Sequence, residues 1–293
     1  MNFLDQWFVT VGLRGDSKET FDTFFSPKLS AGGFVLPVQS GAVSSVKVFG
    51  NIGKGIKSPS FIERYGGGFA DPDPNLKVER ARTADVGVEA TFADQRVRAG
   101  VTYFNNDYKD QVAFIGFNVG DGIPDVVNID GSQASGVELE VALQRPVAGL
   151  TAGATYALVD TEVVTNQSPS QQFQPGQPLL RRPKHSGTIR VGYSMGRLSA
   201  NVDTLWVGDR HDNTFFFPQL RTVANATRPA FSTDLTVNPG YAVAGFGVDY
   251  QVDRRASVYV RVNNVGDTEY DSALGFPGLP RSAMVGVRFN VAR

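Results

Sequence analysis

The sequence has 293 residues, a net charge of -1 from 28 Lys and Arg against 29 Asp and Glu, two His and no Cys. Without Cys, disulfide scaffolds, thiol catalysis and cysteine-ligated metal sites are excluded. Nucleic acid is not an expected partner, because its binding depends on clustered Lys and Arg and this chain has no long basic run. Hydrophobic residues make up 41% of the chain, too many for a disordered protein. No stretch approaches the ~18 apolar residues of a membrane-spanning helix, so any path through a membrane would use β-strands.

A period of two runs along the chain. Between residues 83 and 92 every even-numbered position is apolar, whereas the odd-numbered positions include Asp85 and Glu89. The same sorting recurs over 257–263 and 283–291, where Arg261 and Arg288 fall in the polar rows. This alternation predicts strands with two chemically different faces, and no segment has the period of an amphipathic helix. The predicted strands are 5–15, 26–37, 44–56, 80–93, 95–110, 127–145, 149–161, 185–195, 197–208, 239–252, 256–266 and 281–292.

Short and long connections alternate between these strands. The tight turns lie around 93–95, 145–148, 196 and 253–255, and the long connections are 57–78, 110–126, 161–184, 209–239 and 267–280. An outer-membrane barrel has short periplasmic turns and long extracellular loops, whereas a soluble β-sandwich has no reason to place every long loop at one end. Aromatic residues also gather near strand ends, where interfacial girdles would lie: Trp7, Phe8, Phe92, Tyr103, Phe104, Tyr108, Tyr156, Trp206, Tyr241, Tyr250 and Phe289. The pattern favours an all-β, antiparallel up-and-down transmembrane β-barrel over a sandwich, although alternation alone fits both.

The candidate sites lie in the long connections. His185 and His211 are the only histidines, and neither has the surroundings of a catalytic triad or a two-His metal site, so we expect no enzyme activity, cofactor or metal. Asp71 with Asp73, and Asp121 with Asp125, place two carboxylates in each loop. Two are too few for calcium, which takes six to eight oxygens, so turn chemistry is favoured.

Aromatic residues in two loops are the candidates for ligand binding. Three consecutive aromatics, Phe215, Phe216 and Phe217, stand in a long polar loop. Aromatic anchors of this kind suit a binding loop, but they would equally pack against neighbouring loops or mark the outer girdle. The same two interpretations apply to the second cluster. The predicted ligand-binding residues are Phe61, Arg64, Tyr65, His211, Phe215, Phe216 and Phe217.

Four segments in register carry a family resemblance. They are 51–65, ending in Pro59-Ser60-Phe61 and Glu63-Arg64-Tyr65; 75–89, an acidic and basic run; 127–140, with Asn128 and Gly136-Val137-Glu138; and 262–281, with Asn264, Asp267, Tyr270 and Arg281. Together they resemble the C-terminal part of the β-barrel of TonB-dependent outer-membrane receptors. The resemblance spans nearly the whole chain.

The resemblance implies a protein larger than these 293 residues. Such a receptor has a 22-stranded barrel around an N-terminal plug, so residues 1–293 would be the C-terminal portion of the barrel domain, with about twelve strands and without the plug or the early strands. Residues 1–7 also lack the basic and apolar regions of a secretory signal, which predicts either a cytoplasmic protein or a missing front end.

The implied function is nutrient uptake in the outer membrane of a Gram-negative cell. The receptor would take up a scarce nutrient, such as a siderophore-iron complex or cobalamin, with energy from the TonB complex. Residues 274–281 are closer to the cobalamin type. The implied partners are outer-membrane lipid, the TonB complex through a plug, and a small-molecule or metal-chelate ligand. Two alternatives remain: a passive or structural porin-like barrel of about twelve strands closing on themselves, and a secreted β-sandwich binding module.

Overall fold

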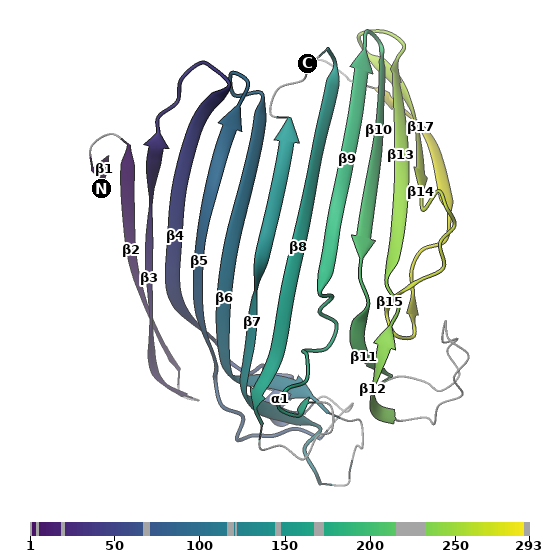
Figure 1. Cartoon of the computed structure of the whole chain (residues 1–293). Coiled ribbons are helices and arrows are strands. Elements are labelled where there is room, and N and C mark those ends of the chain that lie inside the picture. The colour runs from purple at the N-terminus through teal and green to yellow at the C-terminus, as the bar shows by residue number, and fades with distance from the viewer. Residues whose placement is uncertain are drawn as a thin grey trace.

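The computed structural model describes residues 2–3, 6–18, 21–66, 71–115, 120, 122–143, 148–166, 173–214 and 232–289. Thirteen of its strands form one antiparallel sheet in which neighbours follow the order of the chain (Figure 1). The strands of this sheet are β1 (Asn2–Phe3), β2 (Trp7–Lys18), β3 (Phe21–Leu36), β4 (Val43–Lys57), β5 (Glu79–Phe92), β6 (Val97–Phe114), β7 (Val126–Leu143), β8 (Leu150–Thr165), β9 (His185–Met195), β10 (Leu198–Val207), β13 (Tyr241–Gln251), β14 (Ala256–Asn263) and β17 (Ser282–Phe289).

All twelve predicted strands are confirmed. The alternation of apolar and polar residues lies within each strand, so it can be recognised without knowledge of the fold. The long connections were predicted to be loops, but they contain short elements of secondary structure. A five-residue helix, α1 (Phe61–Tyr65), follows β4, although no helix was expected. Two small hairpins also stand in the connections: β11 (Arg210–Thr214) with β12 (Ser232–Asn238), and β15 (Asp271–Ala273) with β16 (Phe276–Pro277). In the described part of the chain no helix is long and apolar enough to cross a membrane.

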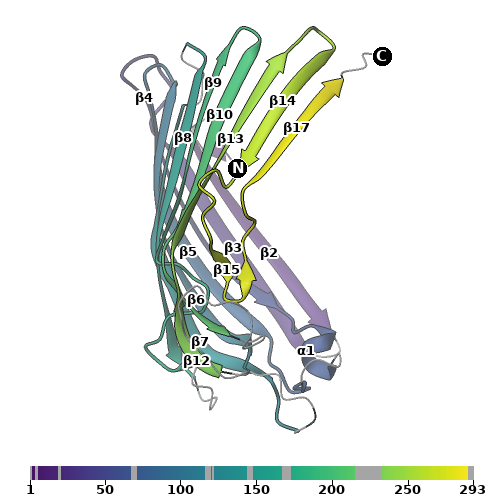
Figure 2. The same cartoon turned by 90° about the vertical axis from the view of Figure 1, so that its right-hand side faces the viewer.

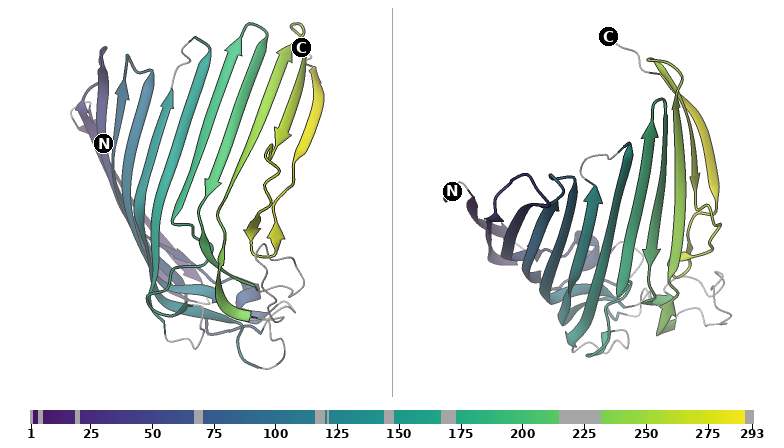
Figure 3. Two further views of the ribbon diagram at one scale, coloured as in Figure 1. Left: turned by 45° about the vertical axis from the view of Figure 1, so that its right-hand side comes forward. Right: turned by 45° about the horizontal axis from the view of Figure 1, so that its top comes forward.

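The sheet is curved and open. Figures 2 and 3 show a bent wall with the chain's first and last strands at its two free edges. Within the described residues, β1 pairs only with β2, and β17 pairs only with β14. This corrects both alternatives in their architecture: the described strands do not form a sandwich of two packed sheets, and the twelve long ones among them do not close on themselves.

The register assigns the two faces of the wall. Lys47, Glu89 and Glu140 fall in one cross-strand row on the polar face. Side chains of this face line two hollows of about 760 and 410 Å³, so the polar face is the concave one. The opposite rows are apolar and exposed, with Val285 at 70% of its full accessibility. An apolar convex face against a polar concave face is the arrangement of a barrel wall in lipid.

The aromatic residues divide between the two faces, which corrects the predicted girdle. Trp7, Tyr250 and Phe289 lie in the outer rows near the short-turn end. Phe8 and Phe104 lie in the inner rows instead, where each ring covers a glycine of the next strand. At Gly136 a side chain is impossible, because a Cβ would lie 2.1 Å from the Leu158 carbonyl oxygen and 2.8 Å from the Phe104 ring. Glycines thus let large inner-face rings lie flat on the wall.

Candidate binding surface at the long-loop end

Helix α1 is specified by its own few residues. The Ser60 hydroxyl accepts from the Glu63 backbone N–H at 3.3 Å, and the Glu63 carboxylate accepts from the Ser60 N–H at 2.5 Å, which is a capping box. No residue of α1 is buried. The helix therefore presents Phe61 and Tyr65, whose ring centroids are 5.0 Å apart, at the surface.

The third candidate residue of this cluster, Arg64, ties α1 to the following segment. Its Nη2 donates to the Leu76 carbonyl oxygen at 2.6 Å, and Leu76 is almost completely buried. The Glu63 carbonyl oxygen also accepts from the Asp73 N–H at 3.2 Å. Arg64 thus holds α1 against the segment that follows it.

Asp71 and Asp125 join the loop after β4 to the loop after β6. The Asp71 carboxylate accepts from the Gly120 and Gly122 backbone N–H groups at 3.0 Å, and the Asp125 carboxylate accepts from the Asp71 N–H at 3.0 Å. The two loops that each showed a pair of carboxylates in the sequence therefore clamp one another. Asp71 and Asp125 thus hydrogen-bond within and between loops, although Asp125 is buried, at 3% exposure, rather than solvated; Asp121 lies outside the described residues.

A small apolar core continues from these loops toward the next connection. Ala113, Ile129, Val163 and Phe173 are buried together, and Ile115, Leu179 and Leu180 pack around them. They come from β6, β7, β8 and the loop after β8. The long-loop end therefore has an interior of its own.

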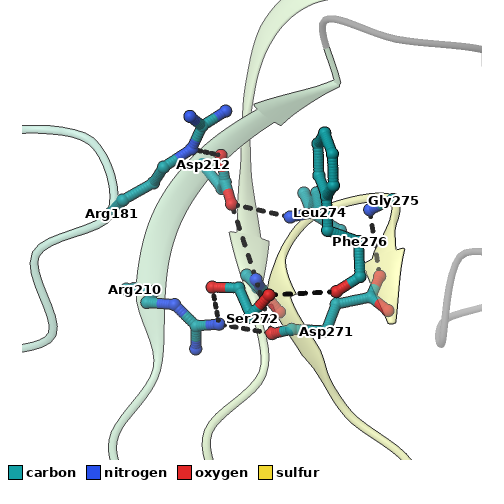
Figure 4. Close-up of polar contacts among 9 residues, drawn as sticks. Arg181, Arg210, Asp212, Asp271, Ser272, Leu274, Gly275 and Phe276 are labelled. Atoms are coloured by element: carbon teal, nitrogen blue, oxygen red, sulfur yellow. Dashed lines mark hydrogen bonds and ion pairs between the residues drawn. The ribbon is translucent and has the colours of Figure 1, made fainter. Parts of the chain in front are cut away.

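A buried polar network links three further connections (Figure 4). Asp212 on β11 has no accessible surface. Its carboxylate accepts from Arg181 Nε at 2.8 Å and from the Leu274 backbone N–H at 2.9 Å. Asn238 Nδ2 lies 3.5 Å from the same carboxylate. One side chain thus connects the loop after β8, the β11–β12 hairpin and the β15–β16 hairpin.

Arg210 extends this network on the other side of Asn238. Its Nη2 donates to the carbonyl oxygens of Asp271 at 2.5 Å and Ser272 at 2.9 Å, and its guanidinium lies 5.4 Å from the centre of the Tyr241 ring. The Asp271 carboxylate in turn accepts from the Gly275 N–H at 3.1 Å. Buried charged groups with several partners each hold the hairpins in one arrangement.

The connection after β14 is stabilised by residues that were prominent in the sequence. Asn264 has a φ of 48°, a left-handed conformation that Asn tolerates. Its side chain bonds to Thr268 N at 2.9 Å and to Leu279 O at 3.0 Å. Asp267 accepts from the Arg281 backbone N–H at 2.9 Å and pairs with its guanidinium at 3.2 Å. The Asn, Asp and Arg of this segment therefore close a loop.

The structure separates the predicted ligand-binding residues into two places. Phe61, Arg64 and Tyr65 lie on α1, and His211 lies on β11, where its carbonyl oxygen accepts from the Arg181 N–H at 2.7 Å. His211 Nδ1 is buried and has no hydrogen-bond partner among the described residues. Phe215, Phe216 and Phe217 lie outside the described residues.

Sequence reasoning missed Asp212, Arg210 and Asn238. They are ordinary polar residues of a long polar loop, and only the fold brings them to Arg181 and Asp271. One feature of the sequence pointed to this network. Arg210, His211 and Asp212 place charged and basic side chains next to each other in the segment that was predicted to be a loop.

Comparison with known proteins gives the family. The model of the family described as "TonB dependent receptor-like, beta-barrel" matches residues 1–265. A vitamin B12 transporter, BtuB, of Photobacterium profundum is 24% identical over 234 residues, which are 78% of this chain and 32% of the transporter. The chain thus spans about a third of the length of this curated relative.

Solved structures of receptors share the fold. The ferripyoverdine receptor of the Pseudomonas aeruginosa outer membrane superposes with a TM-score of 0.68 at 16% identity, covering 99% of this chain and 37% of the receptor. The siderophore receptor PirA of Acinetobacter baumannii gives 0.67 at 17% identity, covering 97% and 43%.

The chain belongs to the TonB-dependent receptor family, as a part of its β-barrel. Members of this family are transport receptors rather than enzymes, and they lie in the outer membrane of Gram-negative bacteria. The predicted fold class, family and localisation are therefore confirmed. The long-loop end is accordingly the extracellular end.

Proposed function

We propose that residues 1–293 are the C-terminal portion of the barrel of a receptor that takes up a scarce nutrient with energy from the TonB complex. The observation that carries this proposal is the asymmetry of the wall: an apolar convex face, a polar concave face with hollows, and extracellular loops locked to one another. A passive pore needs a polar lining but has no need for a locked and structured loop end. The TonB complex would act through a plug that belongs to the rest of the receptor.

The ligand is a cobalamin or a siderophore-iron complex. The curated relative is named as a vitamin B12 transporter, and the superposed receptors are named for siderophores. Residues 274–281, which resemble the cobalamin type, favour cobalamin of the two.

Phe61 and Tyr65 are the proposed ligand contacts that the structure describes. They are 74% and 53% exposed on a helix whose geometry a capping box fixes, so they offer flat apolar surface at little entropic cost. Arg64, His211 and the Phe215–Phe217 run complete the proposed set and remain predictions.

An uptake assay on the natural protein in its own outer membrane tests the function. Cells are given radiolabelled cyanocobalamin or a radiolabelled ferric siderophore, with and without a protonophore. We expect accumulation of one of the two, lost when the protonophore collapses the proton-motive force. Equilibration of small sugars through the protein, with no energised uptake of either probe, would support the porin-like alternative instead.

A double variant tests the ligand contacts. F61A with Y65A should weaken binding of the transported probe about tenfold, as expected for truncating two exposed aromatic anchors. Ile123→Ala, which removes another exposed apolar side chain from an extracellular loop (66% exposed), is the matched control. Equal binding by the double variant and the control would remove Phe61 and Tyr65 from the site.

A further inference from the structure

Three aromatic rings form a plate on the outer face of the wall near its extracellular end. They are Tyr156 on β8, His185 at the start of β9 and Trp206 on β10. Their centroids lie 6.1 to 6.3 Å apart and their planes are within 27° of parallel. Tyr156 and Trp206 both pair with Gly187, so no intervening side chain separates the two rings.

A hydrogen bond fixes the orientation of the plate. The Tyr156 hydroxyl lies 2.7 Å from His185 Nδ1. His185 Nε2 has no hydrogen-bond partner among the described residues, and Trp206 is 43% exposed. The plate thus offers partly exposed aromatic surface together with one ring nitrogen that can bind a polar group.

Toward the middle of the membrane the plate continues into an apolar groove. Ala152 and Ala154 precede Tyr156 on the same face of β8 and form the floor. Val141 on β7 and Ile189 on β9 form the sides, and the volume is about 180 Å³. A groove with small residues on its floor and branched residues at its sides, on a lipid-facing wall, can accommodate an acyl chain.

Toward the extracellular side the plate is followed by basic residues. The run Arg181-Arg182-Pro183-Lys184 leads directly into His185. Arg181 is engaged by Asp212, whereas Arg182 is exposed and has no ion pair among the described residues. Lys184 lies 3.5 Å from Asp160, and both side chains are largely exposed. Lys184, beside Asp160 of β8, and the exposed Arg182 two residues before it are therefore the basic residues that follow the plate on its extracellular side.

We propose that this outer surface over β7–β10 binds a phosphorylated glycolipid of the outer leaflet. An acyl chain lies in the Ala152–Ala154 groove, a sugar ring lies on the aromatic plate, and a phosphate is bound by Arg182 and Lys184. The three parts of the surface follow the three parts of such a lipid in order along the membrane normal. An ordinary aromatic girdle requires neither the groove nor the basic run.

Lipid binding to the natural receptor, purified from its outer membrane in detergent, tests the proposal. Native mass spectrometry with added diphosphoryl lipid A measures affinity. R182A with K184A should weaken binding by about tenfold or more, because each basic residue near an anionic headgroup adds to the attraction. The matched control, R254A with R255A, removes two exposed charges from a periplasmic turn and should bind like the wild type.

Two further variants test the details of the site. Ala154→Phe fills the groove and should weaken binding while the protein stays folded by circular dichroism. Asp160→Asn removes the carboxylate that competes for Lys184 and should strengthen binding about twofold to threefold, a gain that a purely structural role would not give.

Three results would overturn the proposal. Equal losses in the extracellular and periplasmic double variants would mean non-specific attraction. Undiminished binding of dephosphorylated lipid A would exclude the phosphate contact. Equal affinity for phosphatidylglycerol would show a surface for any anionic lipid rather than for a glycolipid.

Discussion

The wall and the extracellular end of this chain are stabilised in different ways. Within the described residues, every buried apolar side chain lies at the extracellular end: Leu76, Val78, Ala113, Val126, Ile129, Val163, Phe173 and Leu274. The wall has no such interior, because its outer rows face lipid and its inner rows face the lumen. Its order comes from the continuous ladder of backbone hydrogen bonds, which lipid requires to be complete.

The comparison also separates two uses of charge. Inner-face pairs such as Arg261 with Asp249, at 2.6 Å, are partly exposed on both sides, so each contributes little. Asp212 is fully buried and bonds to Asn238 of its own hairpin and to two other connections, so its loss removes several buried hydrogen bonds at once. Wall charges make the lumen polar, whereas loop charges fix structure.

A charge placed on the outer face of the wall should have the largest effect. Val260 lies mid-strand on the outer row of β14 and pairs with Val248 and Val285. Val260→Arg should destabilise the barrel by about 2–4 kcal/mol, the cost of Arg near the bilayer midplane. The measurement is urea unfolding of the receptor in lipid vesicles.

The neighbouring residue is the control for this prediction. Arg261→Gln changes the inner face and loses one partly exposed ion pair, so we expect a loss of about 1 kcal/mol or less. If Arg261→Gln proved the more damaging of the two, the inner and outer rows would be interchanged.

The wall was predictable from sequence because its signal is local. Alternation over 83–92 or 257–263 shows which residues share a face of the sheet, and the tight turns and long loops show which strand ends lie together. The openness of the sheet was not readable, because pairing of the first and last strands depends on curvature rather than on any local pattern. The inner positions of Phe8 and Phe104 were missed for a related reason: proximity to a strand end says nothing about the face.

The extracellular end was predictable only where a motif is short-range. The Ser60 and Glu63 spacing is a readable capping box, although five residues are too few to show helical periodicity. Asp71 and Asp125 were noticed as separate pairs, but their mutual clamp joins residues more than fifty positions apart. Asp212 was missed because its partners, Arg181 and Leu274, come from two other connections.

Removing the Asp212 carboxylate should have the next largest effect, confined to the extracellular end. Asp212→Ala removes the hydrogen bonds that the Leu274 N–H and Arg181 Nε donate to this carboxylate, and we expect local stability to fall by about 2–3 kcal/mol. Partial exposure of Arg181 keeps the loss below that of a fully buried pair. Amide hydrogen exchange should speed up over 173–182, 210–214 and 271–279 and stay unchanged in β5 and β6.

Asp160→Ala is the matched control, because it removes an exposed carboxylate paired with Lys184 at 3.5 Å. It should change exchange at the extracellular end hardly at all. If Asp212→Ala unfolded the whole wall, the wall and the extracellular end would be one cooperative unit, and they would not be stabilised separately.

The smallest expected effect lies at the α1 capping box. Ser60→Ala removes the hydroxyl that accepts from the Glu63 N–H, at a typical cost of about 1 kcal/mol for a lost N-cap. Because α1 buries none of its residues, packing does not compensate for the lost cap, and amide exchange over 61–66 should accelerate about fivefold. Ser58→Ala is the control: the Ser58 hydroxyl donates only to the Pro59 carbonyl oxygen, at 3.3 Å, and takes no part in the cap. If both variants left exchange in α1 unchanged, the Arg64 contact to Leu76 rather than the capping box would be what holds the helix, and Arg64→Ala should then release it.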